Sequence, residues 1–211
     1  METNKVLEAR ATGGDADALF RLGYRLAFGR TRARPEPWEQ IATMWHAALD
    51  AGYERANLHL ARLYREGKGV ARNGRRAVGH YTQAAVAGYI DAQYELGWML
   101  RHGDGVPADL EDSVNWFAIG AASGNADCMS EMGYALHEGL GRRRNYRQAV
   151  WFYRRAARRG QVRSMHNLAL CYAEGHGVTA SPRWAHYWMR RAASLGYVPA
   201  RRWLTTNRRG R

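Results

Sequence analysis

Residues 88–124 of this chain read GYIDAQYELGWMLRHGDGVPADLEDSVNWFAIGAASG, and this stretch is one unit of a repeating pattern. Each unit begins with a glycine that is followed four positions later by a small residue. The glycines are separated once by 38 residues and then four times by 36: Gly14, Gly52, Gly88, Gly124, Gly160 and Gly196. A fixed period of this length is typical of a solenoid, in which each unit packs on its neighbours. Solenoids generally serve as recognition surfaces, so the period disfavours an enzyme.

Each unit is expected to form two helices. With the glycine as position 1, small or apolar residues recur at positions 5, 9 and 13, which share one stripe of a first helix, helix A. A tiny residue at position 10, such as Gly97, lets another helix approach closely. A Gly-x-Gly loop follows in four units, and its first glycine suits a helix C′ position with positive φ. A second helix, helix B, sets an aromatic residue or histidine at position 29 between small residues and completes an αα-hairpin.

The combined pattern resembles the Sel1-like repeat, a relative of the tetratricopeptide repeat. The resemblance spans about residues 14–204 and recurs in register. It departs from the family pattern at residues 30–37, which replace the loop of the first repeat, and at residues 142–144, where arginines stand in place of a valine and an acidic residue. Residues 88–124 carry the pattern best, at Ala92, Leu96, Gly97, Gly103, Gly105, Val106, Asp109, Trp116, Ala121 and Gly124.

The resemblance implies an all-α fold, a right-handed α/α superhelix of about five helix hairpins with terminal capping helices. We expect a single solenoid domain over residues 1–207 and a disordered basic tail at residues 208–211. The caps are expected at residues 1–13 and 196–207. The repeats are expected at about residues 14–51, 52–87, 88–123, 124–159 and 160–195.

Cysteine usage and hydropathy bear on the compartment. The first 13 residues have no signal-peptide pattern, and no apolar run approaches membrane-spanning length. Cys128 and Cys171 are at positions 5 and 12 of successive A helices, an offset of about two helical turns along the helix axis. We therefore expect two buried free thiols in place of a disulfide. The sequence therefore predicts a cytoplasmic protein. It favours a monomer and leaves open a dimer built by end-to-end stacking.

Charge divides the chain into two parts. Residues 1–140 carry 15 Lys and Arg against 18 Asp and Glu, whereas residues 141–211 carry 17 Arg against a single glutamate. A field of one sign attracts an anionic partner, although a solvated basic face is the simpler alternative. Trp151, Phe152 and Tyr153 interleave with these arginines at helical spacing, which favours core positions over stacking on bases. The predicted anionic-partner patch comprises Arg142, Arg143, Arg144, Arg147, Arg155, Arg158 and Arg159.

By resemblance to tetratricopeptide-like solenoids, helix A lines a concave groove. Positions 4, 7, 11, 14 and 15 are then expected to face that groove. Aromatic residues and arginine are enriched at interface hot spots, and several occur at these positions. The predicted partner-binding residues are Tyr24, Arg55, Arg62, Arg65, Tyr94, Trp98, Arg101, His102, Tyr134, His137, Arg163 and His166.

No motif in the sequence indicates catalysis. No two of the eight histidines have the i, i+4 spacing with a glutamate that a zinc-binding helix needs, and no serine lies in a Gly-x-Ser-x-Gly elbow. The Gly-x-Gly loops follow helices and lack a dinucleotide-binding context. We therefore expect no catalytic residue, no metal and no cofactor.

The sequence is compatible with two main functions. A third hypothesis, a hydrolase of cell-wall fragments, is disfavoured because the motifs for it are absent. The leading hypothesis is a non-enzymatic adaptor that holds a protein or peptide, possibly acidic, in the helix-A groove. The resemblance suggests a bacterial role in signalling, assembly or neutralisation of a toxic effector. The alternative is binding of nucleic acid or another anionic surface through the arginine-rich C-terminal half, although no nucleic-acid-binding motif accompanies the charge.

Overall fold

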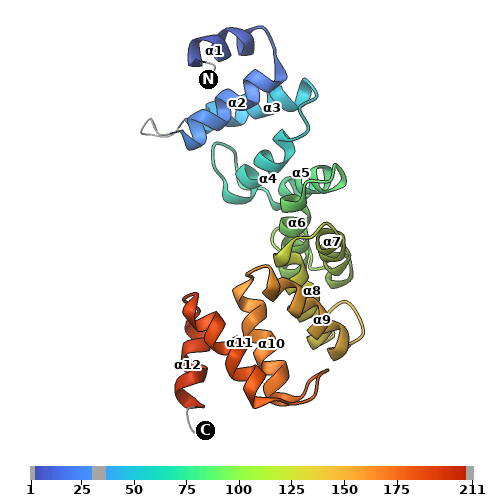
Figure 1. Ribbon diagram of the computed structural model, residues 1–211. Coiled ribbons are helices and arrows are strands. Elements are labelled where there is room, and N and C mark those ends of the chain that lie inside the picture. The colour runs from blue at the N-terminus through green and yellow to red at the C-terminus, as the bar shows by residue number, and fades with distance from the viewer. Residues whose placement is uncertain (1–2, 30–36, 208–211) are drawn as a thin grey trace. The chain divides into compact units, whose positions relative to one another are not determined.

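The computed structural model describes residues 3–29 and 37–207, and within these ranges every regular element is a helix (Figure 1). The all-α prediction is confirmed. The predicted tail at residues 208–211 and residues 30–36 of the unusual first loop lie outside the described residues. The helices are α1 (Asn4–Thr12), α2 (Ala16–Phe28), α3 (Trp38–Asp50), α4 (Ala56–Glu66), α5 (Gly74–Val86), α6 (Ile90–His102), α7 (Leu110–Ala122), α8 (Ala126–Glu138), α9 (Tyr146–Arg158), α10 (Val162–Glu174), α11 (Pro182–Ser194) and α12 (Val198–Thr206).

The chain divides into two compact units, unit 1 (Met1–Ala108) and unit 2 (Asp109–Arg211). In unit 1, α2 packs on α3 and α4 on α5 as hairpins, with α1 against α2 and α6 against α5. In unit 2, α8 packs on α9 and α10 on α11, with α7 against α8 and α12 against α11. The even-numbered helices from α2 to α12 are therefore the A helices, and the odd-numbered helices from α3 to α11 are the B helices.

Local sequence determines where each helix begins and ends. The B helices α5, α7, α9 and α11 each start with a side-chain cap, which accepts a hydrogen bond from the backbone N–H three residues later. The first loop glycine ends helix A in the left-handed region, with φ of 66° at Gly103 and 80° at Gly139. The repeat glycine after helix B also has positive φ, such as 89° at Gly88. The prediction of a positive φ for the first loop glycine is confirmed.

The second loop glycine does more than give the turn its freedom. A Cβ at Gly141 would collide with the carbonyl group of Leu110, the first residue of α7. A Cβ at Gly177 would likewise collide with the backbone of Tyr146, the first residue of α9. Each loop therefore touches the start of the preceding B helix backbone to backbone, and this contact fixes how far successive repeats are offset.

Small residues at position 10 do permit a close crossing of helices A and B. A Cβ at Gly133 would lie 2.6 Å from the ring of Tyr153, and one at Gly23 would lie 2.7 Å from Nε1 of Trp45. The fully buried aromatic residue is at position 30, as in Tyr81 and Tyr153, while position 29 is half-buried at Trp116. The fifth repeat differs, because its position 30 is Met189 and its buried aromatic residue is Trp188 at position 29.

The two cysteines are free and buried, as the sequence predicts. Burial raises the pKa of the Cys171 thiol to about 12, so this thiol stays protonated and unreactive near neutral pH.

Replacing Gly133 with leucine tests the close crossing. Gly133→Leu forces a large side chain against the Tyr153 ring, so the free energy of unfolding should fall by at least about 1–3 kcal/mol. Gly79→Ala is the matched control, because a Cβ at this exposed position within α5 meets nothing within 4 Å. That control should raise stability by about 0.5–1 kcal/mol. Urea unfolding measures both, and equal effects of the two variants would contradict the packing.

One buried histidine makes stability depend on pH. His59 on α4 lies among the rings of Phe20, Tyr24 and Trp45, with centroid distances of 5.1, 5.7 and 4.9 Å. Burial, with smaller effects of Arg62 and Arg55, lowers the pKa of His59 from 6.5 to about 4.

Between pH 6.5 and 4 the unfolded chain binds a proton at His59 that the folded chain does not. Stability should therefore fall as the pH drops through this window, by up to about 3 kcal/mol from His59 alone. Urea unfolding at several pH values measures this loss. His59→Leu should show a shallower pH dependence of stability than the wild type. Parallel slopes for wild type and His59→Leu would contradict the buried neutral state.

Candidate functional site

On the helix-A face of unit 1, two predicted binding residues are engaged by a carboxylate of the chain itself. Arg65 on α4 donates to the Glu95 carboxylate on α6 at 2.6 Å, and Arg62 lies 3.9 Å from the same group. The Arg65 guanidinium also lies 6.0 Å from the ring centroids of both Tyr81 and Trp98. Arg65 therefore joins α4 to α5 and α6, and its role in the fold is structural.

The other predicted residues on this face of unit 1 differ in exposure. Tyr24 is 46% exposed, and Arg55 is also exposed. Trp98 is half-buried and stacks on the exposed ring of His102 at 4.2 Å. Tyr94 and Arg101 are half-buried.

In unit 2 the helix-A face shows a similar arrangement. Arg163 on α10 donates to Glu131 on α8 at 3.2 Å, and the side chain of Glu131 is only 6% exposed. His166 is half-buried beside Tyr197, and burial lowers its pKa. His137 is half-buried, hydrogen-bonded to its neighbour Glu138, and its ring lies 5.4 Å from that of His176. Tyr134 is also half-buried.

Sequence reasoning missed the carboxylates that hold these arginines. Glu95 and Glu131 both occupy position 8, directly before the buried residue at position 9. The recurrence of glutamate at position 8, beside the core, in two successive A helices was the signal. Each pairs with an arginine from a neighbouring A helix, which the repeat pattern alone does not reveal.

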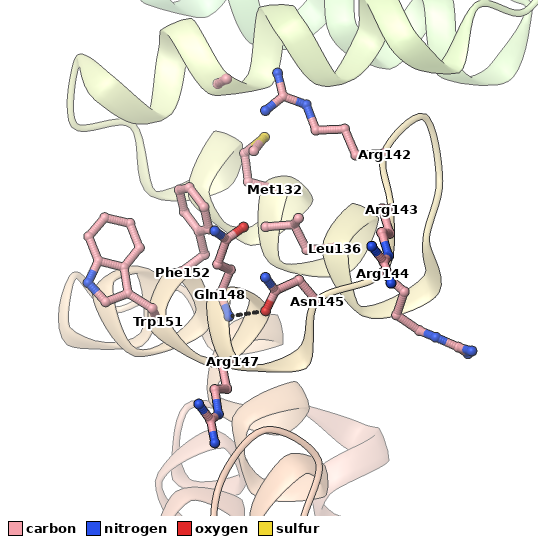
Figure 2. Close-up of a pocket in the computed structure, with 11 residues that line it drawn as sticks. Met132, Leu136, Arg142, Arg143, Arg144, Asn145, Arg147, Gln148, Trp151 and Phe152 are labelled. Carbon is pink, nitrogen blue, oxygen red and sulfur yellow. Dashed lines mark hydrogen bonds between the residues drawn. The ribbon is translucent and has the colours of Figure 1, made fainter.

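The predicted anionic-partner patch is associated with a cavity of about 1220 Å³ in unit 2. The cavity lies between α7, α8, α9 and the loop before α9 (Figure 2). Its lining residues are Ala118, Met132, Leu136, Arg142, Arg143, Arg144, Asn145, Arg147, Gln148, Trp151 and Phe152. Four of the seven predicted arginines line it. Arg155, Arg158 and Arg159 do not.

The lining arginines have no carboxylate partner among the described residues. Arg142 donates to the Asn115 side chain at 2.9 Å, and the Arg144 guanidinium lies 5.5 Å from the ring of Tyr146. Asn145 uses its side chain to cap α9, through the backbone N–H of Gln148. The cavity thus combines cationic groups that are not neutralised with an apolar floor.

Of the three interleaved aromatic residues, only one is in the core. Tyr153 is 2% exposed, Phe152 is half-buried and Trp151 is 50% exposed, so the expectation of a core position was wrong for Trp151. The Arg155 guanidinium lies 4.4 Å from the indole centroid of Trp151 and covers one of its faces. The helical spacing correctly predicted that Tyr153 is buried, but it could not show that Trp151 lies outside the buried face of α9.

Within residues 3–29 and 37–207, no three His, Cys, Asp or Glu side chains converge in a way that could hold a metal ion. In the same ranges, no helix has both the length and the apolar character needed to cross a membrane.

Paired helices in register, small residues at each crossing and glycine-ended loops define an α-helical repeat protein. The Sel1 repeat family model matches residues 16–35, 55–89, 90–125, 126–161 and 162–197. The chain therefore belongs to the Sel1 repeat family. Proteins of this family generally mediate protein–protein interactions and are typically non-catalytic scaffolds.

Solved structures with related folds support the assignment. A protective antigen of uropathogenic Escherichia coli with an SLR fold is 32% identical, with a TM-score of 0.89 over 95% of this chain and 42% of the antigen. The chain thus spans less than half of the antigen's length. A Sel1 repeat protein from Oxalobacter formigenes is 23% identical, with a TM-score of 0.79 over 94% of this chain and 76% of that protein. An immunity protein from Pseudomonas aeruginosa is 25% identical, with a TM-score of 0.52 over 88% and 66%. The comparison with curated proteins finds no match.

The structural role of Arg65 can be tested against that of Arg55. Arg65→Ala should lower the free energy of unfolding by about 1–3 kcal/mol, because it removes a charge-assisted hydrogen bond and leaves Glu95 partly buried without its nearest partner. Arg55→Ala removes an exposed side chain and should change stability by less than about 0.5 kcal/mol. Urea unfolding at low and high salt measures both. An Arg65→Ala variant as stable as the wild type would contradict the structural role.

Proposed function

We propose that the chain is a non-enzymatic scaffold that binds an acidic protein partner through the arginine-rich surface of unit 2. One observation supports this most directly. Among the described residues of unit 2, Arg163 is the only arginine in an ion pair, and its partner is Glu131. The other described arginines of the unit, including those lining the cavity, carry charge that no carboxylate of the described residues neutralises.

Such a surface has a physical consequence for association. Charge of one sign that is exposed to solvent accelerates encounter with a partner of opposite sign and disfavours basic partners. The attraction weakens with salt, because the Debye length is only about 8 Å at physiological ionic strength. A protein partner fits better than a nucleic acid, since Sel1 repeat proteins generally mediate protein–protein interactions and one face of Trp151 is already covered by Arg155.

The helix-A face of unit 1 is a second candidate surface. The Arg65 guanidinium lies 6.0 Å from the ring centroids of Tyr81 and Trp98 and donates to Glu95, so these contacts order half-buried Trp98, a residue type found at interface hot spots. Side chains that are ordered before binding lose less entropy when a partner docks. The immunity protein from Pseudomonas aeruginosa supports neutralisation of a toxic effector as one role for such binding.

Affinity capture from the native host after nuclease treatment, read by mass spectrometry, tests the proposal. We expect an acidic protein to bind the wild type and to be released by about 0.5 M salt. A triple charge-reversal variant, Arg143→Glu with Arg147→Glu and Arg158→Glu, should weaken its binding at least about tenfold. Trp98→Ala with Arg101→Ala should retain it.

Two results would contradict the proposed surface. One is a partner that binds the charge-reversal variant as well as the wild type but is lost from the Trp98 and Arg101 variant, which would assign binding to the helix-A face. The other is capture that disappears on nuclease treatment, which would assign the arginines to nucleic acid. Circular dichroism of each variant verifies that the helices are retained.

A further inference from the structure

The cavity in unit 2 lies where the fourth repeat departs from the others. After the second loop glycine, three repeats have a half-buried valine: Val70, Val106 and Val178. In unit 1, Val70 packs against the core formed by α2, α3 and α4. The fourth repeat has Arg142 at this position, and its guanidinium reaches the side chain of Asn115 on α7. The position after the second loop glycine, which is valine in three repeats, is thus occupied in the fourth repeat by the long cationic side chain of Arg142, which lines the cavity.

The cavity has two chemically different ends. Figure 2 shows Met132, Leu136 and Phe152 in its middle, Trp151 at one end and the arginines of the loop at the other. Met132 and Leu136 belong to the buried side of α8, so the floor of the cavity is part of the hydrophobic core. An occupant that matches both ends must itself have an apolar part and an anionic part.

We propose that this cavity binds an acidic segment of a protein that carries one large apolar side chain. The apolar side chain packs on Phe152 beside Trp151, and neighbouring carboxylates pair with Arg142 and Arg143. This inference rests on the proposed function and deepens it by naming the site and the chemistry of the bound segment.

The arginines at the loop end are suited to carboxylates. A guanidinium presents its N–H groups in a planar fork that matches a carboxylate with two parallel hydrogen bonds. Arg142 now donates to a neutral amide oxygen, so a carboxylate would replace a weaker acceptor with a charged one. Arg143 has no hydrogen bond or ion pair within the described part of the chain. Arg142 and Arg143 can therefore pair with the carboxylates of a partner without first breaking an internal ion pair.

The size and the apolar floor favour a protein segment over other anionic ligands. The volume of about 1220 Å³ exceeds the ~300–1,000 Å³ typical of small-molecule sites. A single-stranded nucleic acid needs successive free aromatic faces for its bases, whereas Arg155 already covers one face of Trp151. The floor of Met132, Leu136 and Phe152 gives phosphates nothing to bind but buries an apolar side chain well.

Fluorescence anisotropy with defined probes tests the inference. The principal probe is a labelled short peptide with one tryptophan beside a run of glutamates. Matched probes replace the tryptophan with glycine, replace the glutamates with glutamines, or substitute an oligothymidylate of the same charge. We expect each peptide change to raise the Kd at least about tenfold, and the oligothymidylate to bind no better than the glutamate peptide that lacks tryptophan.

The variant Arg142→Val gives the fourth repeat the residue of the three others and removes the guanidinium. It should fold with an unchanged or higher melting temperature and should bind the principal probe at least about tenfold more weakly. Arg183→Ala is the matched control, because it removes an equally exposed arginine at the start of α11, away from the cavity. This control should change the Kd by less than about twofold.

Three results would overturn the inference. The first is equal binding of the peptides with and without tryptophan, which would show that the peptides bind only through charge and that the cavity holds no apolar side chain. The second is tight binding of oligothymidylate that Arg142→Val abolishes, which would assign the cavity to nucleic acid. The third is binding that Arg142→Val leaves intact, or no binding of any peptide. None of these peptide and oligothymidylate results is among those that contradict the proposed function, which are capture of the native partner independent of charge on unit 2 and capture that disappears on nuclease treatment.

Discussion

Contact between backbones, at positions where only glycine fits, is the constraint on which the packing within each unit depends. Gly141 against Leu110 and Gly177 against Tyr146 set each loop directly on the start of the preceding B helix. No side chain mediates these contacts, and the four repeats that have the Gly-x-Gly loop share them, at Gly69, Gly105, Gly141 and Gly177. Together with the close crossing at Gly133, they hold the helices in place. The remaining surface positions are then free to differ from one repeat to the next.

That freedom explains how a site could arise without loss of the fold. Arg142 replaces a valine that elsewhere covers the core, yet Gly141 before it and the Asn145 cap after it keep the loop in register. Met132 and Leu136, which are 3% and 4% exposed, remain buried on α8 and line the cavity beside this loop.

The sequence predicted what local chemistry determines. Glycines in the left-handed region, side-chain caps and the stripe of positions 5, 9 and 13 act within one repeat, so the helices and the buried thiols could be inferred from a single chain. The sequence did not predict the pairing of Arg65 with Glu95, because that bond joins different repeats. Nor did it predict the exposure of Trp151, which is 50% exposed, since helical spacing alone does not show which side chains of α9 the neighbouring helices cover. The cavity likewise needs residues of three helices at once.

Arginine has two physically distinct uses in this chain. On the A helices of each unit, Arg65 and Arg163 each form an ion pair with a glutamate at position 8 of a neighbouring repeat. Their charge is therefore balanced within the fold. Around the cavity, Arg142 and Arg143 have no such carboxylate, because the fold supplies an amide at Asn115 and nothing further. From arginine content alone, both sets of arginines would be predicted to bind a partner. The presence or absence of an internal carboxylate partner distinguishes the two groups, and by that criterion the arginines at the cationic end of the cavity belong to the unneutralised arginine surface of unit 2.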